Sequence, residues 1–502
     1  MNPDPDQKKN VSLLSSGIQG LDDILRGGFT INRFYLVEGV PGSGKTTLAF
    51  QFLMEGVRRG EPVIYITLSE TEDELRGIAA SHGWSLEGIT IRELVPPESL
   101  LQPDEQYTMF HPSEVELSET TKTILTTVDE IKPTRVVFDS LSEFRLLAGS
   151  ALRYRRQILA LKQFFSSRKT SVMLLDDMTH DGADQQVQSI AHGIVRLEQL
   201  NPEYGAERRR LSIVKYRGVS FRGGYHDYVI RRGGLEVYPR LVASEHKMPA
   251  ITEKLPSGIA ELDLLIGGGI ERGTSTLIVG AAGSGKSTLA AQFVAAAAAR
   301  GQNAAMFLFD ESIHTLLTRS AALGMDLRKP IQAGRVKVQQ VDPAELSPGE
   351  FVHVIRRSVE EDHAAVLVID SLNGYLNAMP EERFLIAQLH ELLTFLGQSS
   401  VATILIGAHR GLVGGPMVAP VDASYLADSV VLLRYFESKG EVRQAISVVK
   451  KRGGAHERTI REFRMEGGAV KVGPPLREFH GVLTGVPSLE PDTAKFGMNK
   501  NL

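Results

Sequence analysis

Residues 39–47 of this chain read GVPGSGKTT, and residues 280–288 read GAAGSGKST. Both stretches fit the pattern GxxxxGK[ST], and each follows a short apolar run typical of a β-strand and precedes a helical pattern. The glycines allow successive backbone N–H groups to wrap around a phosphate at the start of a helix. A chance glycine-rich turn would not recur in this context, so we predict two nucleotide-binding sites.

Each residue type in these loops has a chemical role. The lysine reaches the β- and γ-phosphates, and the hydroxyl of Thr46 or Ser287 binds Mg²⁺, so ATP and Mg²⁺ are the expected cofactors. The predicted nucleotide-binding residues of the two loops are Gly42, Ser43, Gly44, Lys45, Thr46, Thr47, Gly283, Ser284, Gly285, Lys286, Ser287 and Thr288.

The two loops belong to an internal duplication. SGIQGLD at residues 16–22 is matched by SGIAELD at 257–263, and Glu70 by Glu311, each pair 241 residues apart. We therefore predict an N-terminal tail at 1–11, a first domain at 12–243, a second domain at 250–487 and a C-terminal tail at 488–502.

Short β-branched runs alternate with amphipathic segments in each half. In the first half the runs are 34–38, 63–68, 136–139 and 172–175. Such alternation predicts an α/β fold in which helices flank a mostly parallel sheet, with ligands at the carboxyl ends of the strands. Further runs at 193–198, 211–216 and 228–231 lack helices between them, so we expect antiparallel strands at one edge.

The composition is that of an ordinary globular protein. A length of 502 residues allows more than one domain, and 42% hydrophobic with 23% charged residues argues against a disordered or fibrous chain. The net charge of −4 provides no basic field for nucleic acid or anionic lipid, and the lack of cysteine excludes disulfides and thiolate metal sites. No signal peptide or membrane-length apolar run is present, so we expect a cytoplasmic protein that binds no membrane.

Two aspartates are candidate metal ligands. Asp139 and Asp370 each end an apolar run and precede Ser-Leu, where a carboxylate can hold the water shell of Mg²⁺ beside the phosphates. These are Walker B positions. The alternative is that each aspartate caps the helix that follows.

Three acidic residues are candidate catalytic bases. Glu70 and Glu311 follow the second strand of each half, where a carboxylate can orient an attacking oxygen. Asp310 precedes Glu311, whereas Ser69 holds the matching place in the first half, so the two sites are not equivalent. The alternative is that these acids are solvated strand ends.

Two basic pairs occur near the end of each half. Lys215 and Arg217, and Lys450 and Arg452, alternate along an expected strand and so share one face. Basic side chains at a sheet edge often serve only to prevent aggregation. Taken alone, the pairs leave both interpretations open.

Together these motifs resemble the KaiC family of circadian clock ATPases and autokinases, over residues 12–487. The segments LADSVVLLRYFE (426–437), VVKKRGGAHERTIREF (448–463) and GVLTGVP (481–487) are similar to the kinase half of that family. The resemblance implies two tandem RecA-like P-loop domains and a double-ring homohexamer with ATP at subunit interfaces. It also implies that Lys215, Arg217, Lys450 and Arg452 reach the γ-phosphate held by a neighbouring subunit.

The resemblance further implies hydrolysis in the first ring and phosphoryl transfer to a hydroxyl pair in the second, here Ser424 and Tyr425. Ser424 is the expected phosphosite, but tyrosine replaces the family's threonine and Asp310 replaces its glutamate, which puts a two-site phosphorylation cycle in doubt. A KaiB-like protein or a sensor kinase is the implied signalling partner. The polar tail after Pro487 lacks the segment that clock proteins use to bind KaiA, so KaiA dependence is not expected.

Two other functions remain as alternatives. One is a nucleotide-stabilised scaffold with weak catalysis, which Ser69, Asp310 and Tyr425 favour. The other is a RecA-like DNA motor, which needs basic pore loops, whereas residues 409–420 carry one arginine and no aromatic residue. We therefore expect a slow, hexameric ATP-dependent signalling or timing switch that does not bind nucleic acid.

Overall fold

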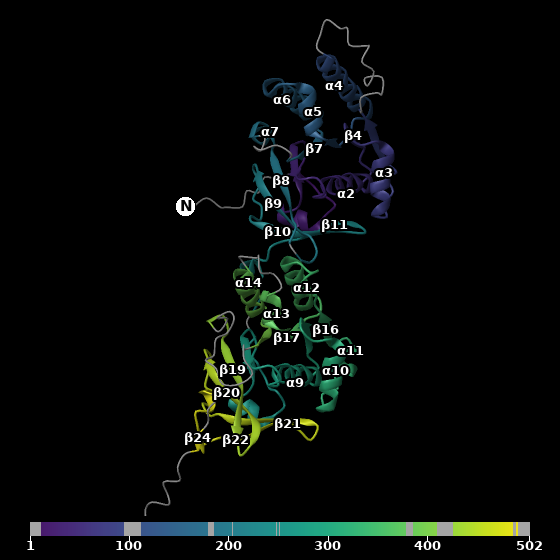
Figure 1. Ribbon diagram of the computed structural model, residues 1–502. Coiled ribbons are helices and arrows are strands. Elements are labelled where there is room, and N and C mark those ends of the chain that lie inside the picture. Colours follow the sequence, from purple (N-terminus) through teal and green to yellow (C-terminus); the bar gives the residue numbers. More distant parts are fainter. Residues whose placement is uncertain are drawn as a thin grey trace, which may run out of the picture. The chain divides into compact units, whose positions relative to one another are not determined.

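The computed structural model describes residues 12–94, 112–178, 185–202, 204–246, 248–249, 251–377, 385–408, 425–484 and 488–489. The chain divides into two compact units, residues 1–240 and residues 241–502 (Figure 1). Each unit has its own sheet and its own hydrophobic core.

The first unit contains the following elements, in chain order: β1 (Leu13–Leu14), α1 (Gln19–Ile24), β2 (Phe29–Thr30), β3 (Phe34–Gly39), α2 (Lys45–Arg58), β4 (Val63–Thr67), α3 (Glu72–Ser81), β5 (Ile89–Glu93), α4 (Pro112–Ile131), β6 (Arg135–Asp139), α5 (Leu141–Ala148), α6 (Ala151–Ser167), β7 (Ser171–Asp177), α7 (Gln185–Ile190), β8 (Gly193–Leu200), β9 (Arg208–Tyr216), β10 (Tyr225–Arg231) and β11 (Gly234–Tyr238).

The second unit repeats this order with small additions: η3 (Ala243–Glu245), β12 (Lys254–Leu255), α8 (Ala260–Leu265), β13 (Ile270–Glu271), β14 (Ser275–Gly280), α9 (Lys286–Ala299), β15 (Asn303–Leu308), α10 (Ile313–Ala322), α11 (Arg328–Gln332), β16 (Val336–Gln340), α12 (Pro348–Glu360), β17 (Ala364–Asp370), α13 (Leu372–Asn377), α14 (Leu385–Gln398), β18 (Ala402–Ala408), β19 (Ser429–Ser438), β20 (Glu441–Lys451), β21 (Arg461–Glu466), β22 (Ala469–Pro475), β23 (Phe479–His480), η5 (Val482–Thr484) and β24 (Ser488–Leu489).

The main sheets of the two units have the same topology. Within the described residues each has nine strands, in the order β11-β10-β9-β8-β3-β7-β6-β4-β5 and β22-β21-β20-β19-β14-β18-β17-β15-β16. Six neighbouring strands of each sheet are parallel: β8-β3-β7-β6-β4-β5 in the first and β19-β14-β18-β17-β15-β16 in the second. The remaining three strands of each sheet pair antiparallel. The predicted α/β fold and its antiparallel edge strands are confirmed.

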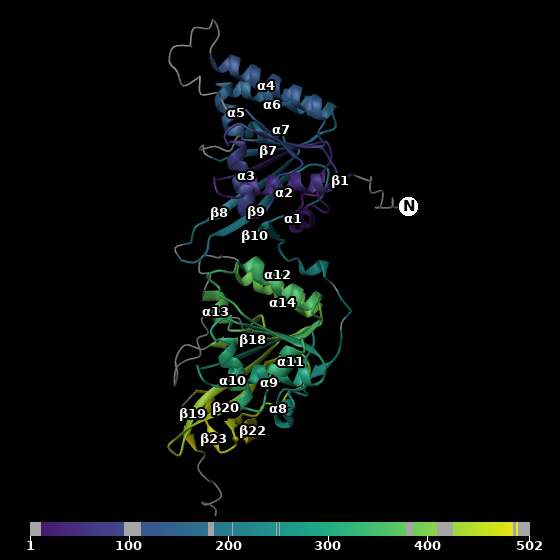
Figure 2. The ribbon, with the colours of Figure 1, turned by 90° about the vertical axis from the view of Figure 1, so that its right-hand side faces the viewer.

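Helices cover both faces of each sheet because side chains alternate along the buried strands. In the first unit Tyr35 and Val37 of β3 pack toward α2, whereas Phe34 and Leu36 pack toward α5 and α6. In the second unit α12 and α14 lie together on one face of the sheet (Figure 2).

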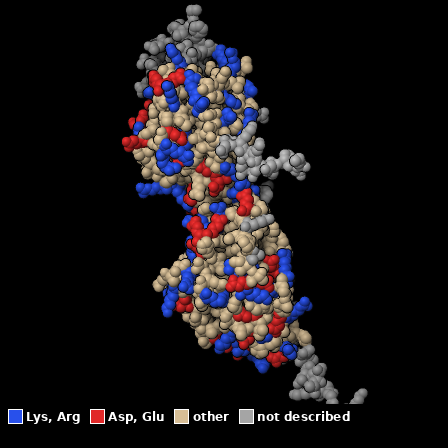
Figure 3. Space-filling view, turned by 180° about the vertical axis from the view of Figure 1, so that it is seen from behind, with Lys and Arg blue, Asp and Glu red and all other residues tan. Residues whose placement is uncertain are grey.

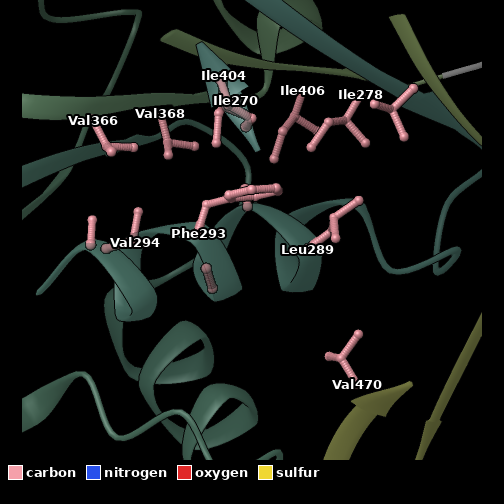
Figure 4. Close-up of a cluster of buried hydrophobic side chains, with 14 of the residues drawn as sticks. Ile270, Ile278, Leu289, Phe293, Val294, Val366, Val368, Ile404, Ile406 and Val470 are labelled. Atoms are coloured by element: carbon pink, nitrogen blue, oxygen red, sulfur yellow. The ribbon is translucent and has the colours of Figure 1, made fainter. Parts of the chain in front are cut away.

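The opposite face of the second sheet packs against α9. The apolar side chains of α9 point toward strands β14, β17 and β18 (Figure 4). The residues of this cluster that the figure labels include Leu289, Phe293, Val294, Ile278, Val366, Val368, Ile404 and Ile406. This packing holds the start of α9, and therefore the preceding loop, against the carboxyl ends of the parallel strands.

The short segment after Arg240 is not wholly exposed. The side chains of Leu241 and Ala243 are buried in the core of the second unit, beside Leu396 of α14. Among the helices in the described ranges, none has both the length and the apolar character that a membrane span requires.

Candidate functional site

The two glycine-rich loops adopt the conformation that their sequences predict. Gly42 and Gly44 have φ values of 81° and 93°, and Gly283 and Gly285 have 76° and 96°, a region that other residues rarely adopt. A Cβ at Gly44 would lie 2.6 Å from Cδ1 of Ile230. Helices α2 and α9 begin at the loop lysines, so each helix N-terminus faces a site suited to a phosphate chain.

The loop lysines are buried but have different partners. Nζ of Lys45 donates to the carbonyl oxygens of Gly39 and Val40 at 2.9 and 3.1 Å, and lies 2.6 Å from Oδ1 of Asp177. Nζ of Lys286 donates to the carbonyl oxygen of Ala281 at 2.7 Å. Burial lowers the pKa of Lys286, and the charge of Asp370 opposes that shift.

Asp139 and Asp370 lie at the ends of β6 and β17, next to the loop lysines in space. The hydroxyl of Tyr65 donates to Asp139 at 2.5 Å, and Ser287 forms a hydrogen bond with Asp370. Burial raises the pKa of both carboxyls. Oδ2 of Asp370 is buried and has no hydrogen-bond partner within the described residues, which leaves an acceptor for a metal-bound water.

The geometry does not favour the capping alternative for these aspartates. Ser140, not Asp139, occupies the N-cap position of α5, and at the start of α13 the backbone N–H of Gly374 donates to Oγ of Ser371, not to Asp370, at 3.0 Å. The peptide bond after each aspartate, Asp139–Ser140 and Asp370–Ser371, is cis.

Glu70 lies in the first site as a poorly paired carboxyl. Burial, together with the charges of Asp139, Glu74 and Asp177, raises its pKa to about 7, and Lys45 opposes the shift. Its Oε2 atom is buried without a hydrogen-bond partner in the described part of the chain. These features suit a group that must accept a proton near neutral pH.

In the second site both acids, Glu311 and Asp310, already have side-chain partners. Oε2 of Glu311 is 2.8 Å from Nη2 of Arg319, which also donates through Nη1 to Thr288 at 3.3 Å. Burial raises the pKa of Glu311, and Arg319 opposes the rise. The hydroxyl of Ser371 donates a short hydrogen bond to Asp310.

An open pocket of about 420 Å³ adjoins the second loop. It is lined by the loop itself, by Arg319, Ala322 and Leu323 at the end of α10, and by Met465 of β21. The described residues contain no group of three or more acidic or histidine side chains that could hold a metal ion. The residues that could hold Mg²⁺ beside a bound nucleotide are Thr46 and Asp139 in the first site and Ser287 and Asp370 in the second.

The two basic pairs, Lys215 with Arg217 and Lys450 with Arg452, lie away from the phosphate loops of their own units. Lys215 pairs in register with Ile194, and Lys450 with Val430, at the amino ends of the central parallel strands and opposite the loops. Lys215 donates to the carbonyl of Gln188 at 2.6 Å, and Arg217 to that of Ser189 at 2.9 Å.

The second pair makes similar contacts. Lys450 donates to the carbonyl of Ala427 at 2.8 Å, and Arg452 to that of Tyr425 at 2.7 Å. The guanidinium of Arg452 also lies 3.5 Å from Asp428, and its side chain is 55% exposed. In both units the pair points to one side, as the alternation predicts.

Three contributors to the sites were missed from the sequence. Asp177, Arg319 and Tyr65 have no counterparts of the same type, since the matching residues are Ala408, Ile78 and Met306. Comparing the two halves position by position would have identified them as differences between the sites. Their contacts would still not have followed, because they depend on strand register and helix packing.

Ser424 and residues 409–420 lie outside the described residues. Tyr425 next to Ser424 is described, and its side chain is 54% exposed. On the face shown in Figure 3, basic and acidic side chains are interspersed.

A parallel sheet that carries a phosphate loop, a strand-end aspartate and a nearby glutamate in each half defines a tandem P-loop ATPase. The family model described as "ATPase: KaiC" matches residues 14–242 and again 255–477. This chain therefore belongs to the KaiC family of ATP-binding P-loop ATPases.

Curated relatives agree over nearly the whole length. Circadian clock protein KaiC3 of Synechocystis sp. is 27% identical over 483 residues, 95% of both chains. Circadian clock oscillator protein KaiC of Synechococcus elongatus is 27% identical over 95% of this chain and 92% of its own. KaiC of Parasynechococcus marenigrum is 26% identical over 95% and 93%.

Proposed function

We propose that this chain is a homohexameric, Mg²⁺-dependent ATPase and serine autokinase that serves as a slow signalling switch. The observation that carries the proposal is the arrangement within each unit. The loop lysine, the aspartate and the glutamate converge at the carboxyl ends of the strands, whereas the basic pair lies at the amino ends. Because the pair lies away from the loop of its own unit, its position supports a role at the site of another copy.

In the first unit Glu70 would accept a proton from the attacking water while Lys45 and Thr46 hold the phosphates. Thr46 and Asp139 would hold Mg²⁺, which would supply positive charge beside the phosphates. The raised pKa of Glu70 and its unpaired Oε2 atom support this role.

In the second unit the hydroxyl oxygen of Ser424 from an adjoining subunit would attack the γ-phosphorus. The bond to the bridging oxygen breaks, ADP leaves, and the hydroxyl proton passes to Glu311 or Asp310. Lys450 and Arg452 would reach the phosphates from the neighbouring copy, and a KaiB-like protein or a sensor kinase would respond to the phosphorylated ring.

One observation favours a second candidate for this unit, a nucleotide-stabilised scaffold with weak chemistry. Both of its acids are already engaged, Glu311 by Arg319 and Asp310 by Ser371. Such a site would bind ATP and hold the ring together without rapid transfer.

The test is to incubate the full chain with Mg-ATP and to locate phosphate by tandem mass spectrometry while phosphate release is followed. The autokinase predicts phosphate at Ser424 that disappears in Lys286→Ala and in Glu311→Gln and persists in Lys45→Ala. Phosphate release without any modification of Ser424 supports the scaffold for the second unit. No release at all contradicts the ATPase.

A further inference from the structure

The lysine of the first phosphate loop already has an anionic partner. Nζ of Lys45 lies 2.6 Å from Oδ1 of Asp177, and the lysine side chain is only 8% exposed. Asp177 is the last residue of β7, and it lies opposite Gly39, where the loop begins. The carboxylate thus contacts the same ammonium group that would bind a phosphate.

The second unit provides an internal comparison because it has the same strand order. There β18 takes the place of β7, and its last residue, Ala408, lies opposite Gly280. Alanine supplies no charge at this position. Lys286 therefore has no carboxylate at this position, whereas the charge of Lys45 is offset by Asp177.

The consequence for nucleotide binding follows from the sign of the charges. Phosphates that approach Lys45 must displace Asp177 or share the ammonium group with it. This competition weakens the binding of an anion in a partly buried site. Ala408 offers no such competition in the second site, whereas Asp139 and Asp370 occupy matching positions and do not distinguish the two sites.

We propose that Asp177 is a built-in counter-ion of Lys45 that lowers the affinity of the first unit for ATP, so that the two sites fill at different nucleotide concentrations. This inference deepens the proposed function and rests on it, because it assumes that both loops bind ATP. Asp177 thus sets the ATP concentration at which the first site fills.

The experiment measures binding of a fluorescent, non-hydrolysable ATP analogue with Mg²⁺ to the full chain, one site at a time. In the Lys286→Ala background, which leaves the first site, Asp177→Asn should tighten binding by about five- to thirty-fold. In the Lys45→Ala background, which leaves the second site, Ala408→Asp should weaken binding by a similar factor.

Asp73→Asn serves as the matched control. It removes one exposed negative charge at the start of α3 and leaves the pair of Lys45 and Asp177 intact, so binding should stay within about twofold. Thermal unfolding of each variant shows that the fold is retained.

The inference is overturned if Asp177→Asn leaves the dissociation constant unchanged or weakens binding, since the latter would make Asp177 a contributor to the nucleotide site. An Ala408→Asp chain with unchanged affinity overturns it equally. If no chain with only the first site binds the analogue, the proposed function of that unit fails and the inference fails with it, whereas binding that Asp177→Asn leaves unchanged overturns the inference alone.

Discussion

At the scale of single residues, Glu70 and Glu311 occupy matching positions in the two units but have different surroundings. Glu70 is half-buried near Asp139, and its Oε2 atom has no hydrogen-bond partner within the described residues, whereas Glu311 is paired with Arg319. Because burial and neighbouring acids raise the pKa of Glu70 to about 7, its carboxylate form predominates only above that pH.

We therefore expect ATP turnover by the first unit to fall as the pH drops below about 7, since a protonated Glu70 cannot accept a proton from water. Glu70→Gln should lower turnover by about 10²–10⁴-fold at pH 8 and abolish this pH dependence, because the amide does not titrate. Phosphate release is measured in the Lys286→Ala background across the pH range.

Glu72→Gln is the control for this experiment, because Glu72 is exposed and pairs with Arg76 on the surface of α3. It should leave turnover within about twofold. A loss of less than about threefold in Glu70→Gln would assign the role of base to another group.

At the scale of elements, helices α2 and α9 carry the loops and anchor them through matched phenylalanines. Phe293 of α9 is 4% exposed and packs among the apolar side chains of the sheet (Figure 4). Phe52 holds the corresponding place on α2 and packs edge-on against Phe29. The position of each loop therefore depends on the packing of its helix.

Phe293→Ala should destabilise the second unit by about 3–5 kcal/mol, because it removes a buried ring and leaves a cavity. Urea unfolding followed by circular dichroism measures the loss. Fluorescence of Trp84, the single tryptophan of the chain, follows the first unit and should keep its midpoint.

The control is Leu264→Ala on α8, where the side chain is 65% exposed and truncation should change stability by less than about 0.5 kcal/mol. Phe52→Ala should instead destabilise the first unit and lower the urea midpoint that Trp84 fluorescence reports. A change below about 1 kcal/mol in Phe293→Ala would contradict the assignment of α9 to the core.

At the scale of the whole molecule, assembly is the expected consequence of basic pairs that lie away from their own phosphate loops. Arg452 is more than half exposed, and among the described residues its side chain contacts the carbonyl oxygen of Tyr425 and the carboxylate of Asp428. An exposed guanidinium of this kind can form charge-assisted hydrogen bonds to a phosphate held by another copy.

Arg452→Ala should weaken nucleotide-dependent assembly by about 10- to 100-fold, the value of one hydrogen bond to a charged group. Light scattering with and without Mg²⁺ and a non-hydrolysable ATP analogue measures the change. Arg357→Ala is the control, because Arg357 of α12 is equally exposed and pairs with Glu361, the residue that follows the helix. Unchanged size and activity in Arg452→Ala would refute the role in a neighbouring site.

Much of this architecture could be predicted because its determinants are local. The loop glycines, the strand-end Asp139 and Asp370, and the alternation of strand and helix patterns are readable within short windows, and the duplication tests each of them twice. The predicted runs at 34–38 and 172–175 lie within β3 and β7, whose bounds are slightly longer. The antiparallel edge strands followed from the absence of helices between them.

The sequence by itself determined that this is a duplicated P-loop protein, because a phosphate loop needs particular residues at fixed spacing. Only the tertiary structure decided which side chains face each loop. Asp177 reaches Lys45 because β7 pairs beside β3 in one register, and Arg319 reaches Glu311 because both lie at the loop end of the sheet. Lys215 and Lys450 lie at the opposite end because β9 and β20 run antiparallel to their neighbours. The relation of Asp177 to Lys45 joins residues far apart in the chain, and all of these relations depend on strand register and helix packing that sequence spacing does not encode.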